Sequence, residues 1–128
     1  MKVIVAGSRN ITDPIHIADA MNAAMASSSG IWIVELVCGE ARGVDSIARH
    51  LIHSVNESIP PDDRIVISSF PAYWDKYGKS AGYRRNLEMA EYADALIAVW
   101  DGKSKGTEHM INIMKKKGKP VYVHQVNP

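Results

Sequence analysis

The sequence predicts an α/β domain built on a parallel sheet, because short apolar runs alternate with amphipathic segments along the chain. The apolar runs are rich in Val and Ile, as buried strands are. The segments between them repeat apolar residues every three or four positions, which is typical of helices with one buried face. A chain of 128 residues has the size of one domain, and we expect residues 1–128 to form a single domain.

The apolar runs predict five strands, at residues 2–6, 31–38, 64–70, 95–100 and 121–126. Right-handed crossovers between parallel strands then give a three-layer, Rossmann-like domain, with about five strands flanked by helices.

Helices are expected between these strands. The first begins at Pro14, with Asp13 as its N-cap, and ends at residues 27–30. The apolar spacing from Val44 to Val55 predicts the second helix. Residues 71–83 are expected to form a long aromatic loop, followed by helices over about 81–93 and 107–117.

Composition excludes several classes of protein. No apolar run approaches the ~20 residues that cross a bilayer, so no membrane span is expected. Cys38 is the only cysteine, which excludes internal disulfides and favours a reducing cytoplasm. The five histidines have no recognised metal-ligand spacing, and we expect neither a metal nor a cofactor.

Charge is distributed unevenly along the chain. Residues 1–63 carry a net charge of −4 and residues 64–128 a net charge of +5. The second half therefore offers a positive field for an anionic ligand. The total charge of +1 makes nucleic acid an unlikely partner, because duplex-binding domains are strongly basic.

Ligands of parallel α/β sheets bind beyond the carboxyl ends of the strands, which directs attention to four loops. In the first loop, Gly7, Ser8 and Arg9 can approach or pair with a phosphate, although an ordinary strand-to-helix turn has the same composition. The second loop offers Gly39, Arg42 and Gly43 at a helix start, where anions are favoured. Asp45, in the first turn of that helix, could either stabilise the helix start or accept a ribose hydroxyl.

The third and fourth loops add aromatic and basic groups. Most aromatic residues of the third loop are expected to pack on the end of the sheet, with one serving as a stacking platform for a base. Two adjacent arginines at a helix start oppose the helix dipole, which a bound anion would offset, and only one of them is expected to face the cleft. The fourth loop has the composition of a phosphate cradle but not the Walker A order. The candidates in these loops are Tyr73, Trp74, Tyr83, Arg84, Arg85, Asn86, Ser104, Gly106 and Thr107.

These loops resemble the SLOG superfamily of Rossmann-like proteins, and most closely its YspA/YpsA-related branch. The resemblance extends over almost the whole chain, with the motifs in the same order. The superfamily includes LOG phosphoribohydrolases and DprA-like DNA-processing proteins. It implies a nucleotide or nucleotide-derived ligand at the strand-end loops, and a homodimer. The motifs that carry it are VIVAGSR (3–9), GEARGVD (39–45), FPAYW (70–74), AGYRRNLEMA (81–90), ADALIA (93–98) and SKGT (104–107).

The resemblance to LOG enzymes also implies catalytic candidates. Arg85 matches the arginine that these N-glycosidases use at a helix start, and Met110 stands where they have a glutamate. The nearest carboxylate is Glu108, which a helix would place about 160° from that position. Glu108, Asp45 and Asp101 are the candidate acids or bases for such a reaction.

Three functions follow from these patterns. The first is a module that binds a nucleotide, such as a nucleoside monophosphate or an ADP-ribose-like compound, to sense or sequester it. The second is a LOG-like N-glycosidase that releases the base from a nucleoside 5′-monophosphate, with Arg85 and Glu108 as catalytic residues. The third, by analogy with DprA-like relatives, is single-stranded nucleic-acid binding, which the near-neutral charge disfavours.

Overall fold

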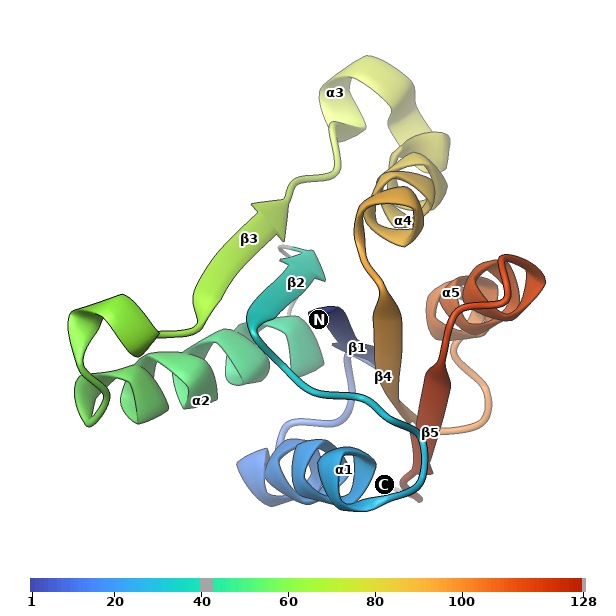
Figure 1. Cartoon of the computed structure of the whole chain (residues 1–128). Helices are drawn as coiled ribbons and strands as arrows, with labels where there is room; N and C mark the ends of the chain where they lie inside the picture. Colours follow the sequence, from blue (N-terminus) through green and yellow to red (C-terminus); the bar gives the residue numbers. More distant parts are fainter. Residues whose placement is uncertain (40–42, 128) are drawn as a thin grey trace.

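A computed structural model describes residues 1–39 and 43–127, and within this part it shows a five-stranded, all-parallel sheet with helices on both faces (Figure 1). The strand order is β3-β2-β1-β4-β5. The predicted α/β class and three-layer arrangement are therefore confirmed. The strands are β1 (Lys2–Gly7), β2 (Glu35–Gly39), β3 (Val66–Phe70), β4 (Ala95–Trp100) and β5 (Val121–Gln125). The helices are α1 (Pro14–Ala26), α2 (Val44–Glu57), α3 (Trp74–Tyr77), α4 (Ala81–Tyr92) and α5 (Lys105–Lys116), with 3₁₀ turns η1 (Pro61–Asp63) and η2 (Gly78–Ser80).

Each face of the sheet has its own hydrophobic core. Val3 and Val5 of β1 pack with α1 and α2, whereas Ile4 packs with α4 and α5. In β4, Ile97 likewise belongs to the first core and Leu96 to the second. Because successive strand side chains point to opposite faces, strands that are apolar throughout must be covered on both sides. This is why the central strands read as continuous apolar runs.

The second strand begins later than predicted, at Glu35 instead of residue 31. Its partner β1 starts at Lys2, which lies opposite Glu35, so residues 31–33 extend past the end of β1. Ile31 and Ile33 are nevertheless buried in the first core. Burial, rather than strand pairing, accounts for the apolar residues of this segment.

Two other boundaries differ from the predictions. The third strand begins at Val66 because the backbone of Ile65 is hydrogen-bonded to the Asn56 side chain instead of to a strand. The Ile65 N–H donates to Asn56 Oδ1 at 2.8 Å, and Asn56 Nδ2 donates to the Ile65 carbonyl at 2.9 Å. The expected loop over 71–83 contains the short helix α3 and the turn η2. Helix α5 begins at Lys105, two residues early, with Ser104 as its N-cap.

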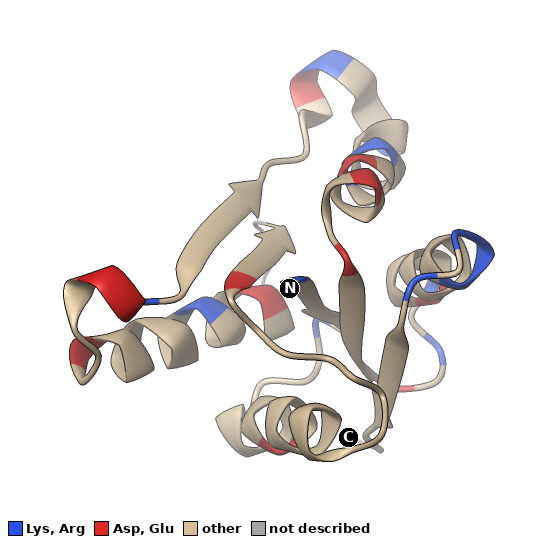
Figure 2. Cartoon of the chain, in the orientation of Figure 1, with Lys and Arg blue, Asp and Glu red and all other residues tan. Residues whose placement is uncertain are grey.

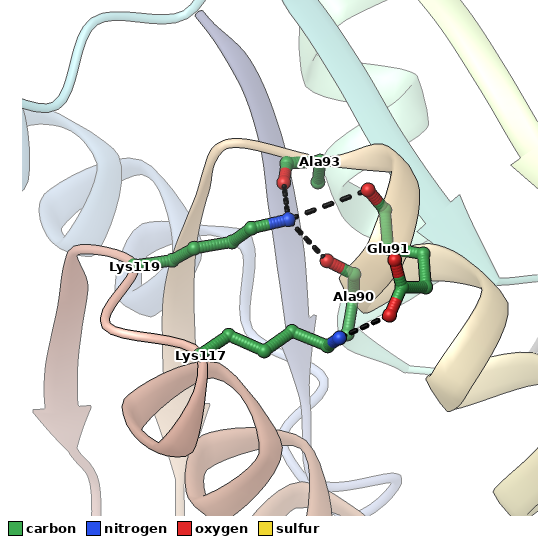
Figure 3. Close-up of polar contacts among 5 residues, drawn as sticks. All are labelled: Ala90, Glu91, Ala93, Lys117 and Lys119. Carbon is green, nitrogen blue, oxygen red and sulfur yellow. Dashed lines mark hydrogen bonds and ion pairs between the residues drawn. The ribbon is translucent and has the colours of Figure 1, made fainter.

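The C-terminal end of α4 is held by lysines from the turn before β5 (Figure 3). The Lys119 ammonium donates to the carbonyl oxygens of Ala90, Glu91 and Ala93 at 2.6, 3.3 and 2.8 Å. Lys117 forms an ion pair with the Glu91 carboxylate. The final carbonyls of a helix have no partners within the helix, so these contacts fix the end of α4 against the sheet.

The order in which strands are added to the sheet reverses at β1. The chain leaves β1 towards β2 and β3 on one side, and returns to β4 and β5 on the other (Figure 1). The carboxyl ends of β1 and β4 therefore flank the crevice in which ligands of such sheets bind. Acidic residues lie in η1, while lysines lie at both ends of α5 (Figure 2). No helix in the described part of the chain is long and apolar enough to span a bilayer.

Candidate functional site

A cavity of about 490 Å³ opens at the carboxyl ends of β1 and β4. The loops that follow these two strands form its floor, and residues of α2, α4 and α5 form its walls. Its described lining residues are Ala6, Gly7, Ser8, Arg9, Asn10, Asp45, Arg85, Asn86, Met89, Asp101, Ser104, Lys105, Gly106, Thr107 and Met110.

Ser8 ties the two floor loops together. Its backbone N–H donates to the Val99 carbonyl, and its Oγ accepts from the Asp101 N–H, each at 3.1 Å. The side chain is only 1% exposed. Ser8 therefore holds the β1 loop against the β4 loop, in addition to lining the cavity.

Asp101 organises the loop before α5. Its carboxylate accepts from the N–H groups of Lys103 and Ser104, both at 2.8 Å, and from the Ser104 hydroxyl at 3.1 Å. These hydrogen bonds, led by the two backbone donors, lower the pKa of Asp101 to about 2. The carboxylate is thus ionised at neutral pH, which argues against Asp101 as a general acid.

The N-terminus of α5 forms one wall. Ser104, Lys105, Gly106 and Thr107 all line the cavity, where the first N–H groups of a helix are free of helical partners. Together with the helix dipole and the Lys105 ammonium, they make this wall favourable for an oxyanion. Glu108 is in the same helical turn but does not line the cavity, whereas Met110 does.

Arg85 enters the cavity from the opposite wall, and its neighbours fix its position. Its Nε donates to the Asn86 side-chain oxygen at 3.2 Å. Asn86 is itself nearly buried and donates to the Gly106 carbonyl at 3.3 Å, which links α4 to α5. The Arg85 guanidinium carbon and an Asp45 carboxylate oxygen lie 2.9 and 2.8 Å from the position that a Cβ on Gly39 would occupy. Arg85 and Asp45 are therefore neighbours above Gly39.

The adjacent arginine points elsewhere. Arg84 donates from Nε to the Ser80 hydroxyl at 3.2 Å, and its guanidinium lies 4.2 Å from the centre of the Tyr77 ring. It lines neither this cavity nor the one beside it. As predicted for neighbouring helical positions, only one arginine of the pair faces the cleft.

A second cavity of about 180 Å³ adjoins the first. Both are lined by Arg9, Arg85, Asn86 and Gly106, and the smaller one is also lined by Trp74, Lys79, Gly82 and Tyr83. The rings of Trp74 and Tyr83 are about half exposed. Tyr83 packs edge-to-face on His109, with ring centres 4.5 Å apart. Tyr73 does not line either cavity.

The glycines of the site differ in the space around them and in their backbone conformation. A Cβ on Gly7 would overlap the Val99 carbonyl and lie 2.7 Å from Val44, and one on Gly39 would overlap Arg85. Gly43 has a φ of 76° and lies against the Arg9 backbone. Close packing against the backbone thus accounts for Gly7 and Gly43 without a ligand, whereas a Cβ on Gly39 would displace the ends of the Arg85 and Asp45 side chains. A Cβ on Gly106 would meet nothing within 4 Å, so packing does not explain that glycine.

Most of the predicted site residues lie together at this end of the sheet. Arg42 falls outside the described residues. Tyr73, Arg84 and Glu108 lie away from the cavity walls, and Gly39 lies behind Arg85 and Asp45. Sequence reasoning did not single out Asn10, Lys79 and Lys105, although all three lie in loops that the strand-end rule indicated. It also missed His109, which nothing in the sequence marks.

Comparison with known proteins gives one informative similarity. The chain is 32% identical over 122 residues to the Gene 61 protein of Mycobacterium phage D29, and the match covers 94% of this chain and 93% of that protein. No family model matches the chain, and no solved structure matches it significantly. This chain therefore belongs to the same family as the phage D29 Gene 61 protein.

Proposed function

We propose that the protein binds a nucleotide or nucleotide-derived anion, as a module that senses or sequesters it. The observation that carries this proposal is the pair of adjoining cavities, which share a wall formed partly by Arg85. One cavity offers cationic groups and a helix start, and the other offers aromatic rings. A nucleotide has a matching anionic part and a matching flat part.

The phosphate belongs in the larger cavity. Arg9, Arg85 and Lys105 supply positive charge there, and the first N–H groups of α5 supply hydrogen-bond donors. The Asp101 charge is already compensated by the donors of its own loop. Asp45, beside Arg85, is the carboxylate placed to accept a ribose hydroxyl.

The base belongs in the smaller cavity. Trp74 and Tyr83 line it with ring surface that remains partly exposed. Stacking of a base on an aromatic ring contributes about 1–3 kcal/mol and tolerates different bases. The proposed ligands are therefore nucleoside monophosphates and compounds such as ADP-ribose and NAD.

Calorimetric titration with AMP, ADP-ribose and NAD tests the proposal, with two variants of adjacent arginines. Arg85→Gln removes a charged donor from both cavities and should weaken binding at least ten-fold, because such hydrogen bonds contribute about 1.5–3 kcal/mol. Arg84→Gln removes the same charge one residue away and should bind normally. Equal affinities of the two variants would contradict the placement of the phosphate.

An N-glycosidase is the second candidate, and the position of Asp45 favours it. This carboxylate lies on the cavity wall beside Arg85, whereas Glu108 does not line the cavity. Release of adenine from AMP, followed by liquid chromatography and mass spectrometry, tests this activity. If the protein is an enzyme, Asp45→Asn should abolish release and Glu108→Gln should not. The reverse result would restore Glu108 as the catalytic residue.

The broader setting is also part of the proposal. The order of the strand-end motifs supports kinship with the SLOG superfamily, and that kinship supports a homodimer. Cys38, the one cysteine of the sequence, is buried, which is compatible with a reducing cytoplasm. Single-stranded nucleic acid remains the less favoured ligand because the net charge is only +1.

A further inference from the structure

Helix α2 carries a second group of polar side chains, away from the candidate site. A cavity of about 280 Å³ is lined by Ser46, Arg49, His50 and His53. Their spacing of three, four and seven residues places them on one side of the helix. The buried residues of α2 are Val44, Asp45, Ala48 and Ile52, so this side faces away from the sheet.

The chemistry of this cavity is uniform. All four side chains can donate a hydrogen bond, and none of the described lining residues is acidic. Glu57 follows His53 by one helical turn but does not line the cavity. None of the four residues lines the two cavities of the candidate site.

Arg49 adds an observation of a different kind. Within the described part of the chain, its Nε is the one buried side-chain nitrogen or oxygen atom without a hydrogen-bond partner. A buried donor that lacks an acceptor destabilises the folded protein by about 1–3 kcal/mol. Arg49 also lines the cavity, where an oxyanion can receive two parallel hydrogen bonds from a guanidinium.

We propose that this cavity binds an anion with two or more linked phosphate groups. Ser46 and His53 are seven residues apart, which is about 10 Å along a helix axis, so one phosphate does not reach both ends of the row. A linked chain of phosphates extends over both turns. A metal ion fits less well, because no third His, Cys, Asp or Glu joins the two imidazoles within the described residues.

Proton NMR of the histidine rings, in one buffer of fixed pH, tests this site directly. Tripolyphosphate should shift the ring signals of His50 and His53 in a saturable manner, with at least ten-fold higher affinity than inorganic phosphate. The same shifts should persist in Arg85→Gln, which separates this site from the proposed nucleotide site. The absence of shifts at both histidines would overturn the proposal.

Two variants test the role of Arg49. Arg49→Lys keeps the positive charge but lacks the forked guanidinium, and it should weaken tripolyphosphate binding about ten-fold. Lys116→Gln removes a charge from an exposed position on α5 and should leave binding unchanged. Equal binding by the Arg49→Lys variant and the unaltered protein would overturn the assigned contact.

A short oligothymidylate identifies the source of the phosphates. If it produces the same histidine shifts, the ligand is the phosphodiester backbone of a nucleic acid. If only tripolyphosphate does so, the ligand is a free oligophosphate. Either result supports the site, provided that Arg49→Lys weakens the binding.

Discussion

A single amide side chain, Asn86, sets the geometry of the candidate site. Its oxygen accepts from Arg85 Nε at 3.2 Å, and its nitrogen donates to the Gly106 carbonyl at 3.3 Å. The same nitrogen lies 3.4 Å from Nδ1 of His109. Asn86 therefore determines where the arginine of α4 stands relative to the first turn of α5.

Gly106 provides the sharpest test of phosphate binding, because the folded protein has room for a larger residue there. Gly106→Ala should leave the fold intact and stabilise it by up to about 1 kcal/mol, since alanine favours helices more than glycine does. The added methyl group would stand on the wall shared by the two cavities and should weaken AMP binding about ten-fold. Urea unfolding and calorimetry measure the two effects. Undiminished affinity would mean that no phosphate approaches this backbone.

His109 predicts a pH effect on stability. Burial lowers its pKa below the ordinary value of 6.5, because the charged imidazole is disfavoured there. As the pH falls, the unfolded chain takes up this proton first, so the free energy of unfolding should decrease from about pH 6.5 downward. The decrease should level off once His109 is protonated in the folded protein too.

Urea unfolding at pH 7.5 and pH 5.5 measures this effect, with His109→Gln as the comparison. The variant should lose the part of the acid sensitivity that His109 contributes. His16→Gln, which changes a histidine of α1 that lines neither cavity of the candidate site, serves as the control. An unchanged pH dependence in His109→Gln would show that another group is responsible.

Among the elements, α4 is the one whose anchoring matters for the site, because its second turn carries Arg85 and its last turn is held by Lys119. Lys119→Met removes the cation from three terminal carbonyls. The free energy of unfolding should fall by about 1–2 kcal/mol, as expected for a partly buried charge at the C-terminal end of a helix. Urea unfolding measures this loss, and hydrogen exchange should increase at the end of α4.

Lys117→Met provides the matched control. Lys117 is on the same turn but pairs with the exposed carboxylate of Glu91. The hydrogen bond and the positive charge of Lys117 lower the pKa of Glu91. Exposed ion pairs contribute little, so its unfolding curve should match that of the unaltered protein. Equal destabilisation by both changes would assign the effect to charge alone and not to the contacts of Lys119.

The order and type of the long elements could be predicted because the burial of apolar side chains governs them. Strands buried on both faces are continuous apolar runs, and helices with one buried face repeat apolar residues every three or four positions. Residues 95–100 form β4 as expected, and α1 begins at Pro14 with Asp13 as its cap. The predictions were wrong where tertiary contacts, and not the local sequence, determine the secondary structure. Burial of Ile31 and Ile33 imitates a strand, and α3 is a single turn whose sequence carries no helical period.

In the molecule as a whole, the candidate site spans both faces of the sheet. Its walls come from α2 on one side and from α4 and α5 on the other. A bound nucleotide would therefore connect elements that lie in separate cores. Binding of this kind stabilises the domain as a unit, not one loop alone.

Thermal unfolding measures this stabilisation. AMP at one hundred times its Kd should increase the free energy of unfolding by about 2.7 kcal/mol and raise Tm by on the order of 10 °C. Arg85→Gln, whose Kd should be at least ten-fold higher, should show an increase of no more than about 1.4 kcal/mol at the same AMP concentration. A Tm that does not respond to any of the three nucleotides would contradict the proposed function.

The location of the site could be predicted from the fold, but its detailed roles could not. The strand-end rule identified the loops because topology alone determines where parallel strands end. Whether Arg84 or Arg85 faces the cavity depends on the rotation of α4, and the role of Asp101 depends on donors within its own loop. Such details follow from packing across the sheet, which local sequence does not encode.

The insertion of β1 between β2 and β4 has a consequence for the order in which the protein is made. While the chain emerges from the ribosome, β1 can pair with β2 early, but its other edge waits for Ala95–Trp100. The contact between Ser8 and Asp101 joins residues 93 positions apart. A nascent chain that has reached β3 thus exposes both an open strand edge and an uncovered apolar face. The candidate site is among the last features that synthesis completes.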